Sequence, residues 1–300
     1  MEANILSYEQ LLTAGHTEAS INDLLERAQL VRLRRGWYAQ SGAGQDATSA
    51  VKAGAFLGCL SGCKAHGLWV PPFEAVHAVY GRGRKPLKRP GIVLHRYAAP
   101  APASPVWPLE DCLAQVIQRH DMETSLIVVE SAVEKQVISQ EEAESMVRAT
   151  PHGDLRRYLA RARSGSETRV RLFFQRRGVP VEALAHIRDV GEVDLRVGSR
   201  LIVECDSAAH HTSVEDRYTD GTRDLNSHLA YYDRIRLGYQ QIWDEWNATQ
   251  IGLSQVLKQR RHISRQRESR ARTPRGKERA RRLGLPPPAH ALINDIRLER

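Results

Sequence analysis

The chain has 300 residues, 41% of them hydrophobic, and a formal net charge of +9. This length predicts at least two domains with folded cores, and the positive charge favours an acidic partner, most commonly nucleic acid. No apolar run reaches the length of a membrane span and the first residues do not begin a signal peptide, so we expect no membrane partner and a cytoplasmic protein with reduced cysteines.

Residues 1–45 predict a winged helix-turn-helix domain, in which two short helices precede a basic strand pair. The expected elements are a helix at 7–14 with Leu11 and Leu12 pointing inward, a helix at 17–28 capped by Thr17, and strands at 30–33 and 37–39. The second helix would read a DNA groove, and the hairpin arginines would lie near phosphates. These arginines are Arg32, Arg34 and Arg35. The alternative is a small helical subdomain that contacts only the rest of the chain.

Four short stretches carry a resemblance to a known family. They are LVRLRRGWYA at 30–39, CLSGCKAHGLW at 59–69, VHAVYGRGRK at 76–85 and GIVLHR at 91–96. The first resembles the end of the N-terminal winged-helix domain of AbiEi-type antitoxins, and the others are similar to the region that follows it. The resemblance covers about the first third of the chain, and it implies DNA binding without indicating a DNA sequence.

Residues 46–160 predict an α+β linking domain. Strands are expected at 76–80 and 92–95, and helices at 109–120, 126–136, 140–149 and 154–163. Ser139 and Glu142 have the spacing of a capping box. Cys59, Cys63 and His66 lack the second ligand pair of a usual zinc site, so we interpret the two cysteines as small buried residues on a helix.

Residues 192–206 predict a β-hairpin, because apolar and polar side chains alternate along both halves. A three-residue loop at 198–200 would pair Val197 with Leu201 and Leu195 with Val203. Asp194 would then lie opposite Glu204, on the face away from the apolar pairs, and Asp206 would join that face.

These three acids repel one another, and burying them carries a desolvation cost. Within the hairpin only Arg196 could neutralise them. A hard divalent cation with oxygen ligands would do so, and this argues for a metal site. The alternative is an ordinary solvent-facing side of an amphipathic strand.

The hairpin lies within an expected α/β domain at 164–260 with a central mixed sheet. The other expected elements are a helix capped by Ser166 and carrying Glu167, a strand near Val181, a helix from about 220 to 235, a strand at 239–243 and a helix at 251–257. Val170, Phe173 and Phe174 would point inward from the first helix. Gly238 would end the helix that precedes the last strand.

The order of these elements, together with Glu167, Asp194 and Glu204, is similar to the very-short-patch-repair type of the PD-(D/E)xK restriction-endonuclease superfamily. The resemblance covers about residues 166–257. It implies that Asp194 and Glu204, with the Cys205 carbonyl, bind Mg²⁺ or Mn²⁺, and that Glu167 is the helix acid. Asp206 stands where the superfamily usually has lysine.

Metal-assisted phosphodiester hydrolysis is the chemistry that this resemblance implies. His210 or His211 could accept the proton from water, although paired histidines after a strand are often loop residues. Arg223 could position a phosphate or pair with an acid at a helix start. Two further departures weaken the expectation of turnover: Ser207 replaces a usual Gly, and Trp243 stands in the last strand where an arginine is often found.

Residues 261–300 form a basic C-terminal extension, which could neutralise phosphates together with Arg260 and Arg261 or remain a solvated arm. The first hypothesis is therefore a DNA-binding, metal-dependent endonuclease of phage defence or a toxin–antitoxin system. The second is a transcriptional regulator or antitoxin whose nuclease-like fold does not cut, and a third is a nuclease that acts on RNA. The oligomeric state stays open, with a homodimer as one option.

Overall fold

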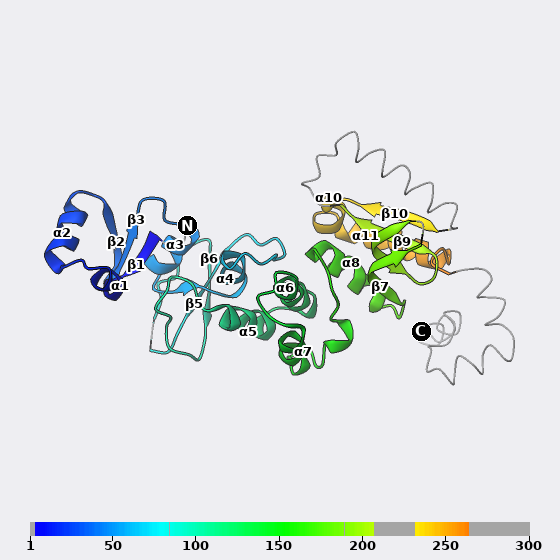
Figure 1. Cartoon of the computed structure of the whole chain (residues 1–300), viewed down its shortest axis with the longest axis horizontal. Helices are drawn as coiled ribbons and strands as arrows, with labels where there is room; N and C mark the ends of the chain where they lie inside the picture. Colours follow the sequence, from blue (N-terminus) through cyan, green and yellow to red (C-terminus); the bar gives the residue numbers. More distant parts are fainter. Residues whose placement is uncertain (1–3, 84, 189, 207–231, 264–300) are drawn as a thin grey trace. The chain divides into compact units, whose positions relative to one another are not determined.

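The computed structural model describes residues 4–83, 85–188, 190–206 and 232–263. The chain divides into two compact units, Met1–Gly165 (unit 1) and Ser166–Arg300 (unit 2), and each combines helices with strands (Figure 1). The protein is therefore of the mixed α/β class, and the expected four-part division stays a prediction. Within the described residues, no helix is both long and apolar enough to cross a lipid bilayer.

Unit 1 begins with two helices and a three-stranded antiparallel sheet of order β1-β3-β2. The elements are β1 (Ile5–Ser7), α1 (Tyr8–Thr13), α2 (Glu18–Glu26), β2 (Leu30–Arg34) and β3 (Trp37–Gln40). Thr17 caps α2 as predicted, and Leu11, Ile21, Leu30 and Tyr38 form the core. The helices and the hairpin are confirmed. Strand β1 was not expected, and the inward orientation predicted for Leu12 is wrong, because its side chain is 43% exposed.

The rest of unit 1 contains a second small sheet, of order β4-β5-β6, and several helices. Its elements are α3 (Gln45–Lys52), β4 (Phe56–Leu57), α4 (Cys59–Ala65), β5 (Val76–Tyr80), β6 (Ile92–Arg96), α5 (Leu109–Arg119), α6 (Met122–Glu134) and α7 (Gln140–Arg148). Strands β5 and β6 are parallel, and both were predicted. The capping box of Ser139 and Glu142 is confirmed.

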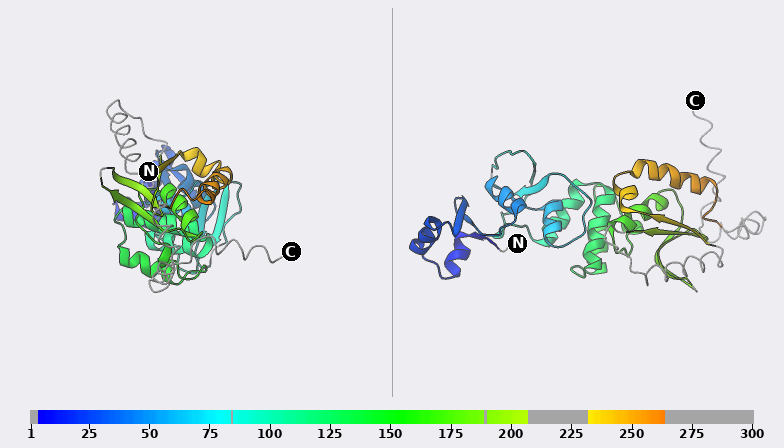
Figure 2. Two further views of the ribbon diagram at one scale, coloured as in Figure 1. Left: turned by 90° about the vertical axis from the view of Figure 1, so that its right-hand side faces the viewer. Right: turned by 90° about the horizontal axis from the view of Figure 1, so that it is seen from above.

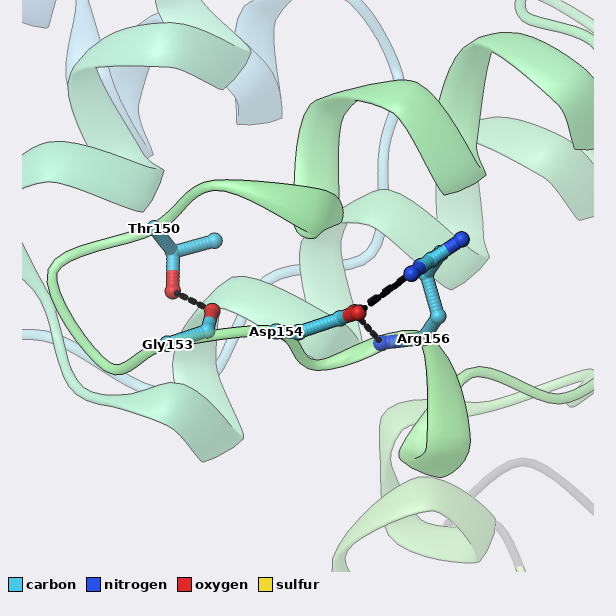
Figure 3. Close-up of polar contacts among 4 residues, drawn as sticks. All are labelled: Thr150, Gly153, Asp154 and Arg156. Carbon is cyan, nitrogen blue, oxygen red and sulfur yellow. Dashed lines mark hydrogen bonds and ion pairs between the residues drawn. The ribbon is translucent and has the colours of Figure 1, made fainter.

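The helix predicted at 154–163 is wrong. The chain leaves α7 through a turn in which the Thr150 hydroxyl donates to the Gly153 carbonyl, and it then forms only a 3₁₀ turn, η2 (Arg156–Tyr158) (Figure 3). The Asp154 carboxylate accepts hydrogen bonds from both the backbone N–H and the side-chain Nε of Arg156, each at 3.0 Å. This local pairing satisfies the backbone without a continued helix.

Unit 2 is built on a four-stranded sheet of order β10-β9-β8-β7. Its elements are α8 (Gly165–Gln175), β7 (Val181–Ile187), β8 (Gly191–Val197), β9 (Leu201–Cys205), β10 (Asp233–Leu237), α10 (Tyr239–Trp243) and α11 (Trp246–Lys258). Strand β10 runs parallel to β9, whereas the other pairs are antiparallel. Figures 1 and 2 show α11, in orange, lying along this sheet.

The main core of unit 2 joins this sheet to its helices. Its buried residues include Val170, Phe173 and Phe174 of α8, Leu195 and Val197 of β8, Leu201 and Val203 of β9, Ile242 of α10 and Leu253 of α11. The predicted inward face of α8 and the predicted register of the β8–β9 hairpin are both confirmed, with Val197 opposite Leu201 and Leu195 opposite Val203.

Three predictions about the end of unit 2 are wrong. Residues 239–243 form helix α10 instead of a strand, and Gly238 begins this helix instead of ending the previous one. Residues 233–235, expected at the end of a helix, belong to strand β10. Residues 234–237, RIRL, alternate polar and apolar side chains, and pairing with β9 satisfies the strand's backbone. The start of the expected helix, up to residue 231, lies outside the described residues.

The hairpin loop fixes a close backbone contact at Gly198, and this contact gives a testable prediction. Gly198 has a φ of +62°, and a Cβ there would lie 2.3 Å from the carbonyl oxygen of His262. Gly198→Ala is therefore expected to lower the free energy of unfolding by about 2 kcal/mol. Gly252→Ala in α11 is the matched control, because its Cβ would meet nothing within 4 Å. That variant should gain about 0.5 kcal/mol. Urea unfolding measures both, and equal losses would contradict the prediction.

Candidate functional site

Three acidic side chains of unit 2 interact electrostatically although they come from three different elements: Glu167 from α8, Asp194 from β8 and Glu204 from β9. Glu167 is only 4% exposed, because the inward face of α8 packs against the sheet. The charges of Glu167 and Asp206 both act to raise the pKa of Asp194, and the charge of Asp194 acts to raise the pKa of Glu204. The acids predicted from the sequence are therefore electrostatic neighbours.

The β8–β9 ladder opens at Asp194. The last paired residues are Leu195 and Val203, and side chains replace the main-chain bonds beyond them. Asp194 Oδ2 accepts from the Cys205 N–H at 2.8 Å, and Glu204 Oε2 accepts from the Asp194 N–H at 3.2 Å. On the other side of β8, Leu184 occupies the position opposite Asp194 with a φ of +49°. The two carboxylates are thus held in place by the strand that each faces.

The simple alternation of core-facing and acid-bearing residues expected for the hairpin is wrong near this opening. Val193 does not join the core that contains Leu195 and Val197. It packs in a second cluster with Ile202, Ala185 and other residues of the sheet. Ile202 is fully buried on the face predicted to carry the acids, so an apolar cluster adjoins the carboxylates. Such surroundings make charge on the carboxylates costly.

Arginines of β10 lie beside the acids. Arg234 Nη2 is 3.0 Å from Glu204 Oε1, and Arg236 Nε is 3.7 Å from Asp206 Oδ2. Arg196, the cation suggested by the sequence, pairs with Glu182 instead. Arg234 and Arg236 were not predicted as site residues, because a helix was expected where strand β10 lies. The alternation of polar and apolar residues at 234–237 was the signal that could have indicated this strand.

The pKa values of Asp194 and Glu204 are both raised, and burial is the largest cause for each. The hydrogen bond from the Cys205 N–H acts in the opposite direction on Asp194, and the Arg234 guanidinium does so on Glu204. Burial also raises the pKa of the Cys205 thiol, so only the carbonyl of this residue could be a ligand for a hard cation. Carboxyl groups with raised pKa values gathered at one point are typical of functional sites.

Other predicted site residues have varied surroundings. Asp206 is exposed. Of the two arginines predicted to contact DNA after α11, Arg260 is half-buried, and Arg261 Nε lies 3.1 Å from Asp233 Oδ2. Ser166 lies inside α8, and its Oγ accepts from the Trp243 indole at 3.0 Å, so its predicted role as the cap is wrong. The remaining predicted residues lie outside the described residues: His210, His211 and Arg223.

The three arginines predicted to contact DNA at the N-terminal hairpin differ in exposure. Arg32 and Arg35 are exposed on β2 and the turn after it. Arg34 is half-buried, with its guanidinium 5.1 Å from the centre of the Phe56 ring. Packing therefore restrains Arg34, and the other two are the more accessible.

Comparison with known proteins adds little. No protein-family model matches the chain, and no curated protein matches it. Among solved structures, it is similar to the RV2827C protein from Mycobacterium tuberculosis, with 15% sequence identity over 49% of this chain and 67% of that chain. The TM-score is 0.25, which is too low to establish a shared fold.

Proposed function

We propose that this protein is a DNA endonuclease that depends on Mg²⁺ or Mn²⁺, with its catalytic site in unit 2. The observation that carries the proposal is that Asp194 and Glu204 lie side by side where the β8–β9 ladder opens, within reach of the charge of Glu167. Asp194, Glu204 and the Cys205 carbonyl offer only oxygen ligands, which is the donor set that hard divalent cations prefer. The raised pKa values of the two carboxyl groups mean that negative charge on them is costly, and a bound divalent cation would stabilise that charge.

We propose separate tasks for the predicted site residues and for Arg234. Glu167 orients a water molecule beside the metal ligands, and Arg234 supplies the positive charge that Asp206 cannot supply in place of the superfamily lysine. His210 or His211 accepts a proton from the attacking water. A bound Mg²⁺ supplies the remaining chemistry, since it polarises a phosphate oxygen and lowers the pKa of water.

Cleavage of supercoiled plasmid DNA tests this proposal. The full-length chain should nick the plasmid in Mg²⁺ or Mn²⁺ and should not do so in EDTA. Calcium ions, which bind oxygen ligands in a looser geometry, serve as the control for metal binding without efficient chemistry. An otherwise identical incubation with structured and single-stranded RNA separates DNA cleavage from the RNA-directed alternative.

The second candidate function is a DNA-binding regulator or antitoxin that does not cut. Two observations favour it: each carboxylate already has protein partners, and Arg234 holds Glu204 at 3.0 Å. A metal would have to compete with these contacts. A chain that retards DNA in a gel but leaves plasmid intact in both Mg²⁺ and Mn²⁺ would support this function and overturn the nuclease.

In both functions we propose that residues 1–45 act as a winged helix whose wing contacts DNA. The α1, α2 and β2–β3 arrangement supports this proposal. Helix α2 carries Glu18, Asp23 and Glu26, and its Arg27 is paired with Asp23 at 2.9 Å, so the hairpin is the more favourable phosphate contact. Because α2 is acidic and the hairpin is basic, we expect the hairpin wing, and not α2, to make the main contact with DNA phosphates.

Replacing the exposed wing arginines should weaken DNA binding. The Arg32→Ala/Arg35→Ala double variant is expected to lose about tenfold or more in affinity at 100 mM salt, with a salt dependence shallower by about two phosphate contacts. Arg27→Ala is the matched control, because that arginine is also exposed but is paired with an acid. Fluorescence anisotropy across a salt series measures the effect. Equal affinity and slope for the double variant and the wild type would remove the wing from the interface.

A further inference from the structure

A cluster of sulfur and nitrogen ligands lies within unit 1. Its members come from four separate elements: Cys59 begins α4, His77 lies on β5, His95 lies on β6 and His120 follows α5. The Cys59 Sγ, one ring nitrogen of His77 and one of His95 all lie within 4.8 Å of one another. His120 Nε2 lies 3.0 Å from Cys59 Sγ, and His77 Nδ1 lies 3.0 Å from His95 Nε2.

These separations fit the edges of a small coordination tetrahedron. Zinc bonds of about 2.3 Å to sulfur and 2.0 Å to nitrogen place neighbouring ligand atoms about 3.3–3.6 Å apart. The separations among the Cys59, His77 and His95 ligand atoms are all under 4.8 Å, so shifts of about an ångström close these three around one ion. His120 contacts Cys59 Sγ at 3.0 Å but lies outside this group of three, so its ring would move further to join them. We propose that Cys59, His77 and His95 bind one Zn²⁺ ion in unit 1, with His120 as the fourth ligand.

The backbone around Cys59 is organised to present its thiol. Cys59 has a φ of +51°, a strained conformation for a residue other than glycine. Its N–H donates to Gln115 Oε1 at 2.8 Å, and no larger residue fits at Gly58, where a Cβ would meet Val79 Cγ2 at 2.5 Å. Strain held by such fixed contacts is common where a side chain has a function beyond packing.

The histidines are positioned in a similar way. The backbone N–H of His77 donates to Ser61 Oγ at 2.9 Å, and the ring of His77 packs edge-on against Phe73. Strands β5 and β6 are parallel with Val79 opposite His95, so His77 and His95 project from one face of the sheet, diagonally across the strand pair. The neighbouring cation Arg119 donates to the carbonyl of Arg96, which directs its guanidinium to the backbone.

The cluster favours a metal over two other roles. Cys59 is fully buried, and an attacking nucleophile needs access to its substrate. A simple hydrogen-bonded histidine cluster explains the 3.0 Å contacts but gives no reason for the strained cysteine. One sulfur and up to three imidazole nitrogens select zinc over Mg²⁺, which prefers oxygen. The proposal therefore does not depend on the nuclease function of unit 2.

Metal analysis of the full-length protein, purified without a histidine tag, tests the proposal. We expect about one zinc per chain, and a cobalt-substituted protein that shows thiolate-to-cobalt charge-transfer absorption and tetrahedral visible bands. Cys59→Ser should abolish the charge-transfer absorption, and His95→Ala should weaken cobalt affinity at least about tenfold. Circular dichroism shows whether each variant has kept its fold.

Three controls make the result specific. Cys63→Ser alters a buried cysteine on the same helix, and His66→Ala alters a histidine that contacts the Trp107 carbonyl instead of the cluster. Asp194→Asn removes an acid of unit 2. All three should keep zinc and the cobalt spectrum. A folded wild-type chain that binds neither zinc nor cobalt would overturn the proposal, as would an unchanged cobalt spectrum in Cys59→Ser.

Discussion

Asp194→Asn is expected to lower Mg²⁺-dependent plasmid cleavage by about 10³-fold or more. The change removes one negative charge from the proposed metal ligands, and transition-state stabilisation of several kcal/mol depends on that charge. The amide oxygen of Asn can still accept the Cys205 N–H, which Asp194 Oδ2 now accepts at 2.8 Å. The fold should therefore survive while the chemistry is lost. Initial rates of nicking, measured over a Mg²⁺ series, give the effect.

Glu204→Gln should lose cleavage to a similar extent, although it also breaks the ion pair with Arg234. Asp244→Asn is the matched control, because Asp244 is exposed at the end of α10 in the same unit and outside the acid cluster. It should cut at the wild-type rate. If Asp194→Asn and Glu204→Gln both cut at wild-type rates, the proposed metal ligands are wrong wherever the activity resides.

The same Asp194→Asn substitution is expected to stabilise the metal-free protein, by about 1 kcal/mol or a few degrees in Tm. Burial and the neighbouring acids raise the pKa of Asp194, so its negative charge destabilises the fold at neutral pH. Thermal unfolding in EDTA at pH 7.5 measures the gain. Added Mg²⁺ should reverse the order, because only the wild type gains free energy from binding the ion.

The raised pKa of Asp194 also predicts how the stability of the metal-free protein depends on pH. A carboxyl group with a raised pKa in the folded state binds protons more readily folded than unfolded. The metal-free wild type should therefore gain stability as the pH falls from neutral toward the ordinary carboxyl range, and Asp194→Asn should gain less. A loss of stability in Asp194→Asn at pH 7.5 would show that the charged hydrogen bond to Cys205 outweighs the burial of the charge.

The sequence determined much of the local structure. The alternation in residues 192–206 predicted the β8–β9 register, since a period of two and a three-residue loop allow few other pairings. Local sequence also predicted the helix caps at Thr17 and Ser139 and the inward face of α8, because each depends on residues only a few positions apart. Within the candidate site, the strand alternation selected Asp194 and Glu204, whereas Glu167 came only from the family resemblance.

Only the tertiary structure decided what surrounds these residues. Strand β10 pairs with β9 and carries Arg234 and Arg236 to the acids, a contact that spans about thirty residues and leaves no periodic signal in the hairpin. The separation of Cys59 from His120 is 61 residues, and their spacing matches no usual metal motif. Periodicity reports which face of an element is buried, whereas the packing of distant elements determines which side chains meet there.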